Sequence, residues 1–223
     1  MNPFSTKRVK FVLLQCIGYL LLMFPLAVLI PKEEMTLMIN NWVMNQEDTW
    51  ALDSFFKYIT HLGDGLMIGV WFVIFLFFRL YYGMAVLGTG LVHLIFIFVF
   101  KKLIFNGMKR PWGFFEDDSV LHAIEGVKQH KYNTFPSGHT ATAFAIATLL
   151  ALTVPNRKWV PLIILLAAVV GFSRVYLNQH FLIDTYVGAV VGMVSTFIVW
   201  MIFEKWTSLH QQPWINWTVT KRK

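Results

Sequence analysis

Charged residues are scarce in this chain. Only 14% of its 223 residues are Asp, Glu, Lys or Arg, whereas a soluble domain carries about 25%. Apolar residues make up 57% of the sequence and are gathered in long runs, which excludes an ordinary soluble domain. We therefore expect an all-α, polytopic membrane protein that forms a single membrane domain over residues 1–223.

Cysteine is nearly absent as well. The single cysteine, Cys16, lies inside an apolar run, so no disulfide can form within the chain. The net charge of +7 is the kind of surplus that a nucleic-acid-binding protein carries. Here the basic residues lie between apolar runs and form no basic stripe, so we expect no nucleic-acid partner.

Six apolar runs approach or reach the length of about 20 residues that a membrane-spanning helix needs. The first follows a basic flank and is longer than the apolar part of a signal peptide, so we expect it to be retained as a membrane helix. A tight connection at Tyr81-Tyr82-Gly83 is predicted between the second and third spans. The six predicted spans are residues 11–30, 64–80, 84–104, 136–154, 159–176 and 181–203.

A polar stretch with interspersed aromatic residues separates the first two spans. Between Trp50 and Leu62 the apolar residues recur at roughly helical spacing, and Gly63-Asp64-Gly65 follows. This pattern predicts an amphipathic helix that lies in the membrane interface. The alternative is a helix that packs against the membrane bundle as part of its core.

The segment Thr134-Phe135-Pro136-Ser137-Gly138-His139 precedes a run of small and apolar residues. Proline is well tolerated in the first turn of a helix, because its missing N–H group would be unpaired there anyway. We therefore expect Ser137, Gly138 and His139 at a helix N-terminus, whose free N–H groups favour an anion. Gly138 would let a bulky anion approach the backbone closely.

A second polar segment, Ser173-Arg174, is followed by His180 and Asp184. Residues four apart lie on one face of a helix, so Asp184 is expected to hold the His180 imidazole in one tautomer. The planar guanidinium of Arg174 suits phosphate oxygens.

A third segment runs from Lys101-Lys102 to Arg110-Pro111. Together the three segments are strongly cationic and contain no cluster of thiols or carboxylates. Such a set suits phosphoryl transfer, in which stabilising charge on the phosphate oxygens is most of the work.

These three segments resemble the signature motifs of the type 2 phosphatidic acid phosphatase superfamily, written K-x6-R-P, P-S-G-H and S-R-x5-H-x3-D. The second and third motifs match without a change. In the first, seven residues separate Lys102 from Arg110, and Leu103 occupies the expected lysine position. We assign Lys102 to the motif, since Asn106-Gly107 is expected to interrupt the helix, and Lys101 and Lys109 are the alternatives. The resemblance covers roughly residues 50–203.

The resemblance implies a membrane lipid phosphatase that works through a phosphohistidine. His180 would attack phosphorus, Asp184 would orient it, and His139 would protonate the leaving oxygen and later activate water. Neither a metal nor a cofactor is expected. The implied phosphate-binding residues are Lys102, Arg110, Ser137, Gly138 and Arg174.

The family's substrates are phosphatidic acid, phosphatidylglycerol phosphate, undecaprenyl diphosphate and lipid A phosphates, so the expected partner is a lipid phosphate. Within enzymes, the alternative is a phosphotransferase that moves the phosphoryl group from one lipid to another. A non-catalytic lipid-binding or transport protein is a further alternative. A transporter gives no reason for a His–Asp pair beside the Pro-Ser-Gly-His segment.

Six spans place both termini on one side of the membrane. That side carries ten of the 19 Lys and Arg residues, Lys221-Arg222-Lys223 among them, and the other side carries nine. Five of those nine belong to the candidate site: Lys101, Lys102, Lys109, Arg110 and Arg174. Without them the positive-inside rule puts the termini in the cytoplasm and the site on the extracytoplasmic side, for which a bacterial cytoplasmic membrane is the expected location.

The remaining polar residues are expected to lie in the core or in solvent, outside the candidate site. His93 lies in an apolar run and is predicted to be a core histidine. His122 and His130 lie in the polar stretch 105–135 and are predicted to be solvated. The acidic run Glu116-Asp117-Asp118 is predicted to be a solvated loop face, with headgroup selection as the alternative.

Overall fold

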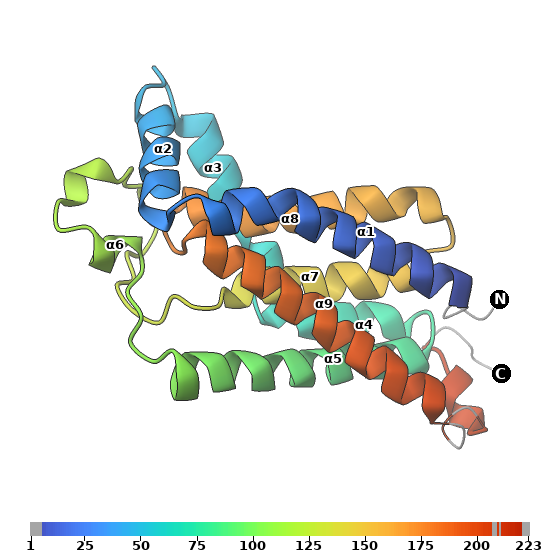
Figure 1. Ribbon diagram of the computed structural model, residues 1–223. Coiled ribbons are helices and arrows are strands. Elements are labelled where there is room, and N and C mark those ends of the chain that lie inside the picture. Colours follow the sequence, from blue (N-terminus) through green and yellow to red (C-terminus); the bar gives the residue numbers. More distant parts are fainter. Residues whose placement is uncertain (1–5, 207–208, 210, 220–223) are drawn as a thin grey trace.

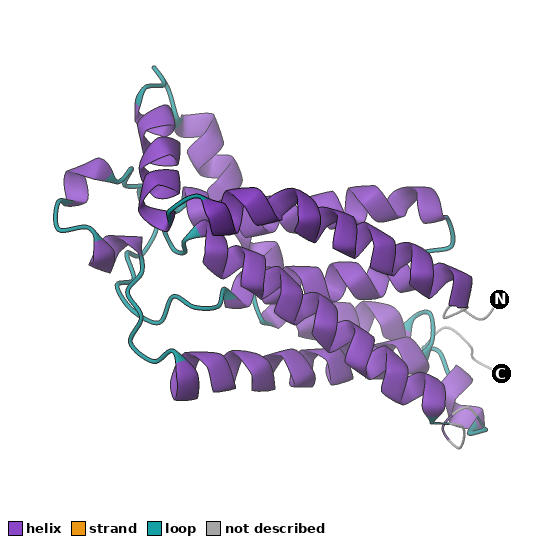
Figure 2. Ribbon diagram, viewed as in Figure 1, coloured by secondary structure: helices purple, strands orange, loops and turns teal. Residues whose placement is uncertain are grey.

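The computed structural model describes residues 6–206, 209 and 211–219, and over these residues the protein is helical, without a strand (Figure 2). The basic tail Lys221-Arg222-Lys223, which contributes to the predicted orientation, lies outside the described residues. The all-α prediction is therefore confirmed for the part of the chain that is described.

Four helices in the described residues are long and apolar enough to cross a membrane. Two of them end in π-helical turns, at Pro25–Leu29 after α1 and at Val99–Ile104 after α5. The four helices are α1 (Thr6–Phe24), α5 (Leu80–Phe98), α8 (Val160–Tyr176) and α9 (Leu182–Lys205). The chain is therefore a multi-pass membrane protein.

Two further predicted spans are shorter or bent. The 3₁₀ turn η2 (Thr60–Gly63) extends α3 (Trp50–Ile59), and the pair meets α4 (Leu66–Leu76) at an angle of 64°. The helix at the predicted span 136–154 is α7 (Gly138–Thr153), which has 16 residues. It is about 24 Å long at 1.5 Å per residue. Helices thus occur at all six predicted spans, and the crossing of the membrane by six of them stays a prediction.

The short helix α7 lies in the middle of the bundle (Figure 1). Most of its side chains are buried, and many are Ala or Thr. Small side chains let neighbouring helices approach closely, and α7 packs against α9, α8 and α5. An apolar helix surrounded in this way holds its N-terminal residues at a fixed place.

One helix was not predicted from the sequence, and one predicted connection is wrong. The stretch before α3 holds another helix, α2 (Lys32–Met44), in which Asn40 is buried and hydrogen-bonded to Asn178. Tyr81-Tyr82-Gly83 is not a connection, because α5 already begins at Leu80. Gly83 serves helix packing instead, since a Cβ atom there would lie 3.1 Å from Leu76 Cδ2 on α4.

The bundle has two distinct ends (Figure 1). The start of α1 and the end of α9 lie at one end, and α2, α3 and the short helix α6 (Pro111–Phe114) gather at the other. The last turn of α5, the start of α7, the end of α8 and the start of α9 all lie toward the second end. The three sequence segments are thereby brought to the same end of the molecule.

Candidate functional site

Ser137 caps the N-terminus of α7. Its hydroxyl oxygen accepts hydrogen bonds from the Thr140 backbone N, at 3.4 Å, and the Thr140 hydroxyl, at 2.9 Å. Ser137, Gly138 and His139 therefore lie at a helix N-terminus, as predicted. Pro136 was predicted in the first turn but precedes the cap, because the serine side chain supplies the hydrogen bonds that begin the helix.

The backbone of Gly138 borders open space. No heavy atom of the described residues lies within 4 Å of the position that a Cβ atom would take at this glycine, neighbouring residues and the helix's own backbone aside. Packing within the chain therefore does not require a glycine here. The open space lies beside the helix N-terminus, where an anion is favoured.

His180 and Asp184 form a buried pair, with 3.4 Å between Nδ1 and Oδ2 and side chains only 2% and 1% exposed. The two residues meet for a different reason than the one predicted. His180 precedes α9, so it does not share a helix face with Asp184. Asp184 occupies the third position of α9 and accepts the Phe181 backbone N–H, at 2.9 Å. This capping interaction turns the carboxylate back toward His180.

Thr134 completes the pair and was not predicted. Its hydroxyl donates to Asp184 Oδ2 and lies 3.3 Å from His180 Nδ1. Since the hydroxyl proton points to the carboxylate, the network assigns the imidazole proton to Nδ1. Nε2 then carries the lone pair, which is the state that a nucleophilic histidine requires.

The surroundings of His180 keep it neutral. Burial and, after it, the nearby charges of Arg110, Arg174 and Lys101 hold the pKa of His180 well below its usual range. His180 is therefore uncharged at neutral pH, with its lone pair available.

Arg174 lies in the last turn of α8 and is buried. Its Nη1 donates to the Thr60 hydroxyl at 2.8 Å, whereas its Nε is buried without a hydrogen-bond partner among the described residues. An unpaired buried N–H group is costly. A bound anion would supply the missing acceptor.

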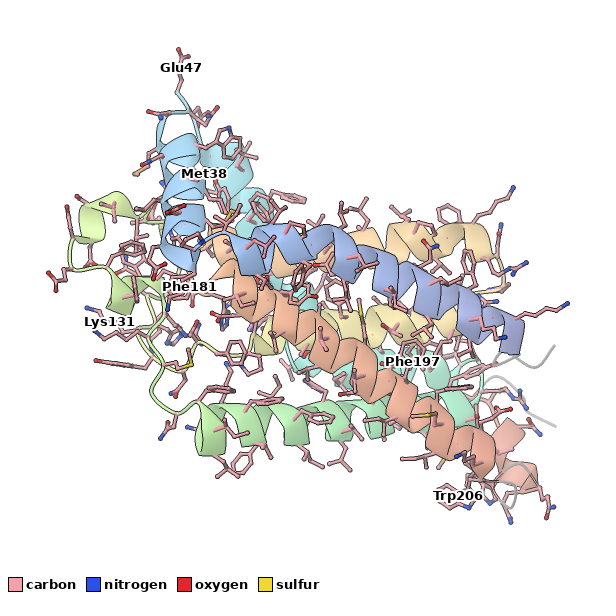
Figure 3. The ribbon with its side chains drawn as sticks, viewed as in Figure 1. Met38, Glu47, Lys131, Phe181, Phe197 and Trp206 are labelled. Atoms are coloured by element: carbon pink, nitrogen blue, oxygen red, sulfur yellow. The ribbon has the colours of Figure 1, made fainter. Side chains whose placement is uncertain are left out.

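Arg110 connects the polar stretch 105–135 to the segment that leads into His180. Its Nη1 donates to the Gln179 backbone oxygen at 3.0 Å and to Gln179 Oε1 at 3.2 Å, and its Nε donates to the Tyr132 oxygen at 2.9 Å. Gln179 immediately precedes His180 and was not predicted as a site residue. Arg110 thus both brings positive charge near His180 and holds the adjacent backbone. Figure 3 shows Lys131 and Phe181 at this end of the molecule.

Of the three candidate lysines, the structure brings Lys101 to the site. Its side chain is half-buried, its Nζ donates to the Asn133 oxygen at 3.1 Å, and it lies near enough to Asp184 to interact electrostatically. Lys102, the residue assigned from the motif spacing, and Lys109 have exposed side chains. The last turn of α5 is π-helical, and an insertion of this kind shifts the register of an α-helix, so residue counting alone does not identify the lysine that faces the site.

Asp64 pairs with His139 and was missed in the sequence. Its Oδ1 lies 2.7 Å from His139 Nε2, and its Oδ2 lies 2.8 Å from His61 Nδ1. Gly63 permits this approach, because a Cβ atom there would lie 2.7 Å from the His139 backbone oxygen. The Gly63-Asp64-Gly65 run ends the preceding helix as predicted, but its packing against α7 is visible only in three dimensions.

The histidines His93, His122 and His130 differ in burial and in the groups that they contact. His93 is a core histidine as predicted, with Nδ1 2.9 Å from the Gly90 oxygen and Nε2 3.3 Å from the Thr142 hydroxyl. His130 is exposed as predicted. His122 is not simply solvated, because it is half-buried with Nε2 2.9 Å from Asp53 Oδ1.

No group of three or more His, Cys, Asp or Glu side chains that could hold a metal ion occurs among the described residues. The site groups are instead mainly imidazoles and cations. Metal independence stays a prediction, to be tested with a chelator.

An apolar cavity of about 160 Å³ lies between α4, α7 and α8. Its lining includes Ala143 and Val170, which lie one helical turn from His139 and Arg174, and Leu62 and Met67, which flank Asp64. The cavity therefore begins close to the polar site and continues toward the apolar part of the bundle. Its lining suits a hydrocarbon chain.

Comparison with known proteins places this site in context. Residues 76–208 match the model of the PAP2 superfamily. The chain is 27% identical over 121 residues to the bacitracin transport permease protein BcrC of Bacillus licheniformis and 35% identical over 107 residues to the lipid A 1-phosphatase of Porphyromonas gingivalis. These alignments cover 54% and 40% of this chain and 59% and 24% of the two relatives, less than two thirds of each relative's length.

Two solved structures are similar to the structure of this chain. Aquifex aeolicus LpxE superposes with a TM-score of 0.63 at 25% identity, over 75% of this chain and 93% of that one. A PAP2-type phosphatidylglycerolphosphate phosphatase from Bacillus subtilis superposes with a TM-score of 0.56 at 25% identity, over 86% of this chain and 96% of that one.

Proposed function

We propose that this chain, which belongs to the PAP2 superfamily, hydrolyses the phosphate or diphosphate headgroup of a membrane lipid. The observation that carries the proposal is the environment of His180, a neutral buried imidazole with Asp184 behind it and positive charge around it. A neutral nucleophile beside cations suits attack on a phosphate, because the cations stabilise the negative charge on its oxygens.

In the proposed first step, His180 Nε2 forms a bond to phosphorus and the bond from phosphorus to the leaving oxygen breaks. Asp184 stabilises the positive charge that develops on the imidazole, and His139 gives a proton to the leaving oxygen. In the second step a water oxygen attacks phosphorus, the phosphorus–nitrogen bond breaks, and His139 takes the proton of that water. The sum is one water consumed and one phosphate released.

The phosphate oxygens would be bound by residues from all three segments. The buried and unpartnered Nε of Arg174 is one donor, and the Gly138 backbone N–H and the Ser137 hydroxyl are others. Lys101 replaces Lys102 in this proposal, since its side chain is the one turned toward the site. Arg110 contributes charge and holds Gln179 next to His180.

The lipid character of the substrate is supported by the apolar cavity beside His139 and Arg174. It is also consistent with the relatives, which include a lipid A 1-phosphatase and a phosphatidylglycerolphosphate phosphatase. The candidate headgroups are those of undecaprenyl diphosphate, phosphatidylglycerol phosphate, phosphatidic acid and lipid A phosphates. We favour a headgroup reached from the extracytoplasmic side of a bacterial cytoplasmic membrane, with six crossings, cytoplasmic termini and α3 in the interface.

The test is phosphate release by the full-length protein in detergent with EDTA, from a panel of these four lipids. We expect release from at least one lipid and a loss of at least about a thousandfold in His180→Ala, which lacks the nucleophile. His130→Ala is the matched control, because His130 is an exposed histidine. Rapid quenching of a ³²P-labelled lipid reaction should trap an acid-labile, alkali-stable phosphoprotein in the wild type but not in His180→Ala.

Undiminished release by folded His180→Ala would contradict the proposal. Absence of phosphate release, with transfer of the label to an added acceptor lipid, would instead identify a phosphotransferase. Lipid binding without release or transfer would identify a binding or transport protein.

A further inference from the structure

The pair formed by Asp64 and His139 is unlike the pair formed by Asp184 and His180. We infer that Asp64 is a positioning residue that holds the His139 imidazole through Nε2 and favours its protonated form, so that His139 can act as the general acid. This inference rests on the proposed function, because it concerns the proton that the leaving group receives. It assigns the chain two His–Asp pairs with opposite tasks.

The geometry of the second pair is direct. Asp64 Oδ1 lies 2.7 Å from His139 Nε2, a shorter contact than the 3.4 Å between Asp184 and His180. The side chains of His139 and Asp64 are 31% and 34% exposed, so water and a substrate can reach them, whereas the other pair is almost fully buried. His139 Nδ1 makes no hydrogen bond to any described residue and is free to face a substrate.

The charges that face His139 come from several elements. Burial opposes protonation of the imidazole most strongly, and the cationic Arg174 on α8 and Lys101 in the last turn of α5 oppose it as well. His180 from the connection between α8 and α9 is close but neutral. Asp64, between η2 and α4, is the carboxylate within hydrogen-bond distance of His139. Its negative charge counteracts the two cations, so the imidazole is more easily protonated with Asp64 than without it.

Asp64 is held in place by the packing of η2. Arg174 donates to the Thr60 hydroxyl in this turn at 2.8 Å, and Gly63 packs against the His139 backbone. The same arginine that is proposed to bind phosphate therefore also fixes the turn that carries Asp64. The carboxylate is part of a packed element rather than of a loose loop.

His61 connects the pair to solvent. Its Nδ1 lies 2.8 Å from Asp64 Oδ2, and its side chain is 66% exposed. Both oxygens of the Asp64 carboxylate are thus engaged by imidazoles, one in the site and one at the surface.

The proton balance follows from these contacts. Nε2–H of His139 donates to Asp64 throughout the cycle, while the proton on Nδ1 moves to the leaving oxygen as its bond to phosphorus breaks. Nδ1 then takes a proton from the water that attacks the phosphohistidine, which restores the imidazolium. Asp64 stays ionised in both steps and exchanges no proton with the substrate.

The experiment compares Asp64→Asn with the wild type on two substrates, a lipid phosphate and p-nitrophenyl phosphate. An alkoxide leaving group needs a proton, whereas p-nitrophenolate leaves without one. We expect kcat/KM to fall by about a hundredfold on the lipid, within the range for loss of general acid catalysis, and by less than about threefold on the aryl ester. His139→Ala should show the same pattern, and the alkaline limb of the kcat/KM profile of Asp64→Asn should move to lower pH.

Glu47→Gln is the control, because Glu47 is an exposed carboxylate on the connection between α2 and α3 (Figure 3). This substitution should leave kcat/KM unchanged on both substrates. Equal losses on both substrates in Asp64→Asn, with an unmoved pH profile, would mean that Asp64 is only structural and would overturn the inference. Unchanged activity would overturn it as well. If the wild type hydrolyses neither substrate, the proposed function itself fails.

Discussion

The Thr134 hydroxyl donates to Oδ2 of Asp184, the same oxygen that lies 3.4 Å from His180 Nδ1. Thr134 comes from the segment before α7 and Asp184 from the start of α9, so this bond joins two of the three motif segments. The backbone bond from Ser137 N to Asp184 O, at 2.9 Å, reinforces the same junction. The carboxylate that orients the proposed nucleophile is therefore itself oriented by the segment that is proposed to bind phosphate.

Removal of the Thr134 hydroxyl should impair catalysis without unfolding the protein. Thr134→Val keeps the shape of the side chain but leaves the buried carboxylate with one donor fewer, so kcat should fall by about tenfold. Thr134→Ser keeps the hydroxyl and serves as the control, with kcat within about threefold of wild type. Phosphate release and thermal unfolding in the same detergent check this, and equal activity of the two variants would contradict it.

The choice among the three lysines gives a second prediction. Lys101→Ala should lower kcat/KM by at least about fiftyfold, because it removes a charge beside the proposed phosphate site. Lys102→Ala and Lys109→Ala should stay within about threefold of wild type, since these side chains are exposed. A larger loss in Lys102→Ala than in Lys101→Ala would restore the assignment made from motif spacing.

The stability of the unliganded protein should depend on pH through His180. Its pKa is lowered in the folded state by burial and neighbouring cations, so below about pH 6.5 the unfolded chain takes up a proton that the folded protein does not. The free energy of unfolding should therefore fall as pH drops below that value, by up to about 1.4 kcal/mol per pH unit. Thermal unfolding in detergent between pH 5 and 7.5 measures this.

His180→Asn removes this titrating group and should make that pH dependence shallower, while His130→Asn should change it less. Identical slopes for wild type and His180→Asn would show that other groups govern the acid sensitivity.

Gly63 gives a prediction about packing. A Cβ atom at this position would lie 2.7 Å from the His139 backbone oxygen, so Gly63→Ala should push η2 away from α7 and displace Asp64. We expect phosphate release from the lipid to fall by about tenfold or more, as small displacements of catalytic groups are costly. Gly65→Ala is the matched control, because no heavy atom of the described residues, chain neighbours aside, lies within 4 Å of that Cβ position. Equal activity of both variants would contradict the proposed role of the turn.

Much of the site was predictable because its residues lie in short segments whose structure depends on residues close by in the chain. Ser137 caps α7 within its own segment, and His180 and Asp184 are close in the chain, so tertiary contacts are not needed to associate them. Even here the reason was partly wrong, since Asp184 reaches His180 by capping α9 rather than by sharing a helix face.

The predicted spans match helices because long apolar runs have one stable form in a membrane, where each backbone group must find its partner inside the helix. The connections were harder. Gly83 and the tyrosines before it were interpreted as a turn, but that glycine serves the approach of α4 and α5. A glycine needed for packing and a glycine needed for a turn look the same in a single sequence.

The sequence by itself determined the fold class, the helices at the predicted spans and the motif residues from Ser137 to Asp184, because apolar runs and short-range hydrogen bonds act along the chain. Only the tertiary structure decided that Lys101 rather than Lys102 turns to the site, since a π-helical turn changes the direction of each side chain. It also decided that Asp64 meets His139, because that contact depends on η2 packing against α7. Contacts between distant segments arise from packing, which no local pattern encodes.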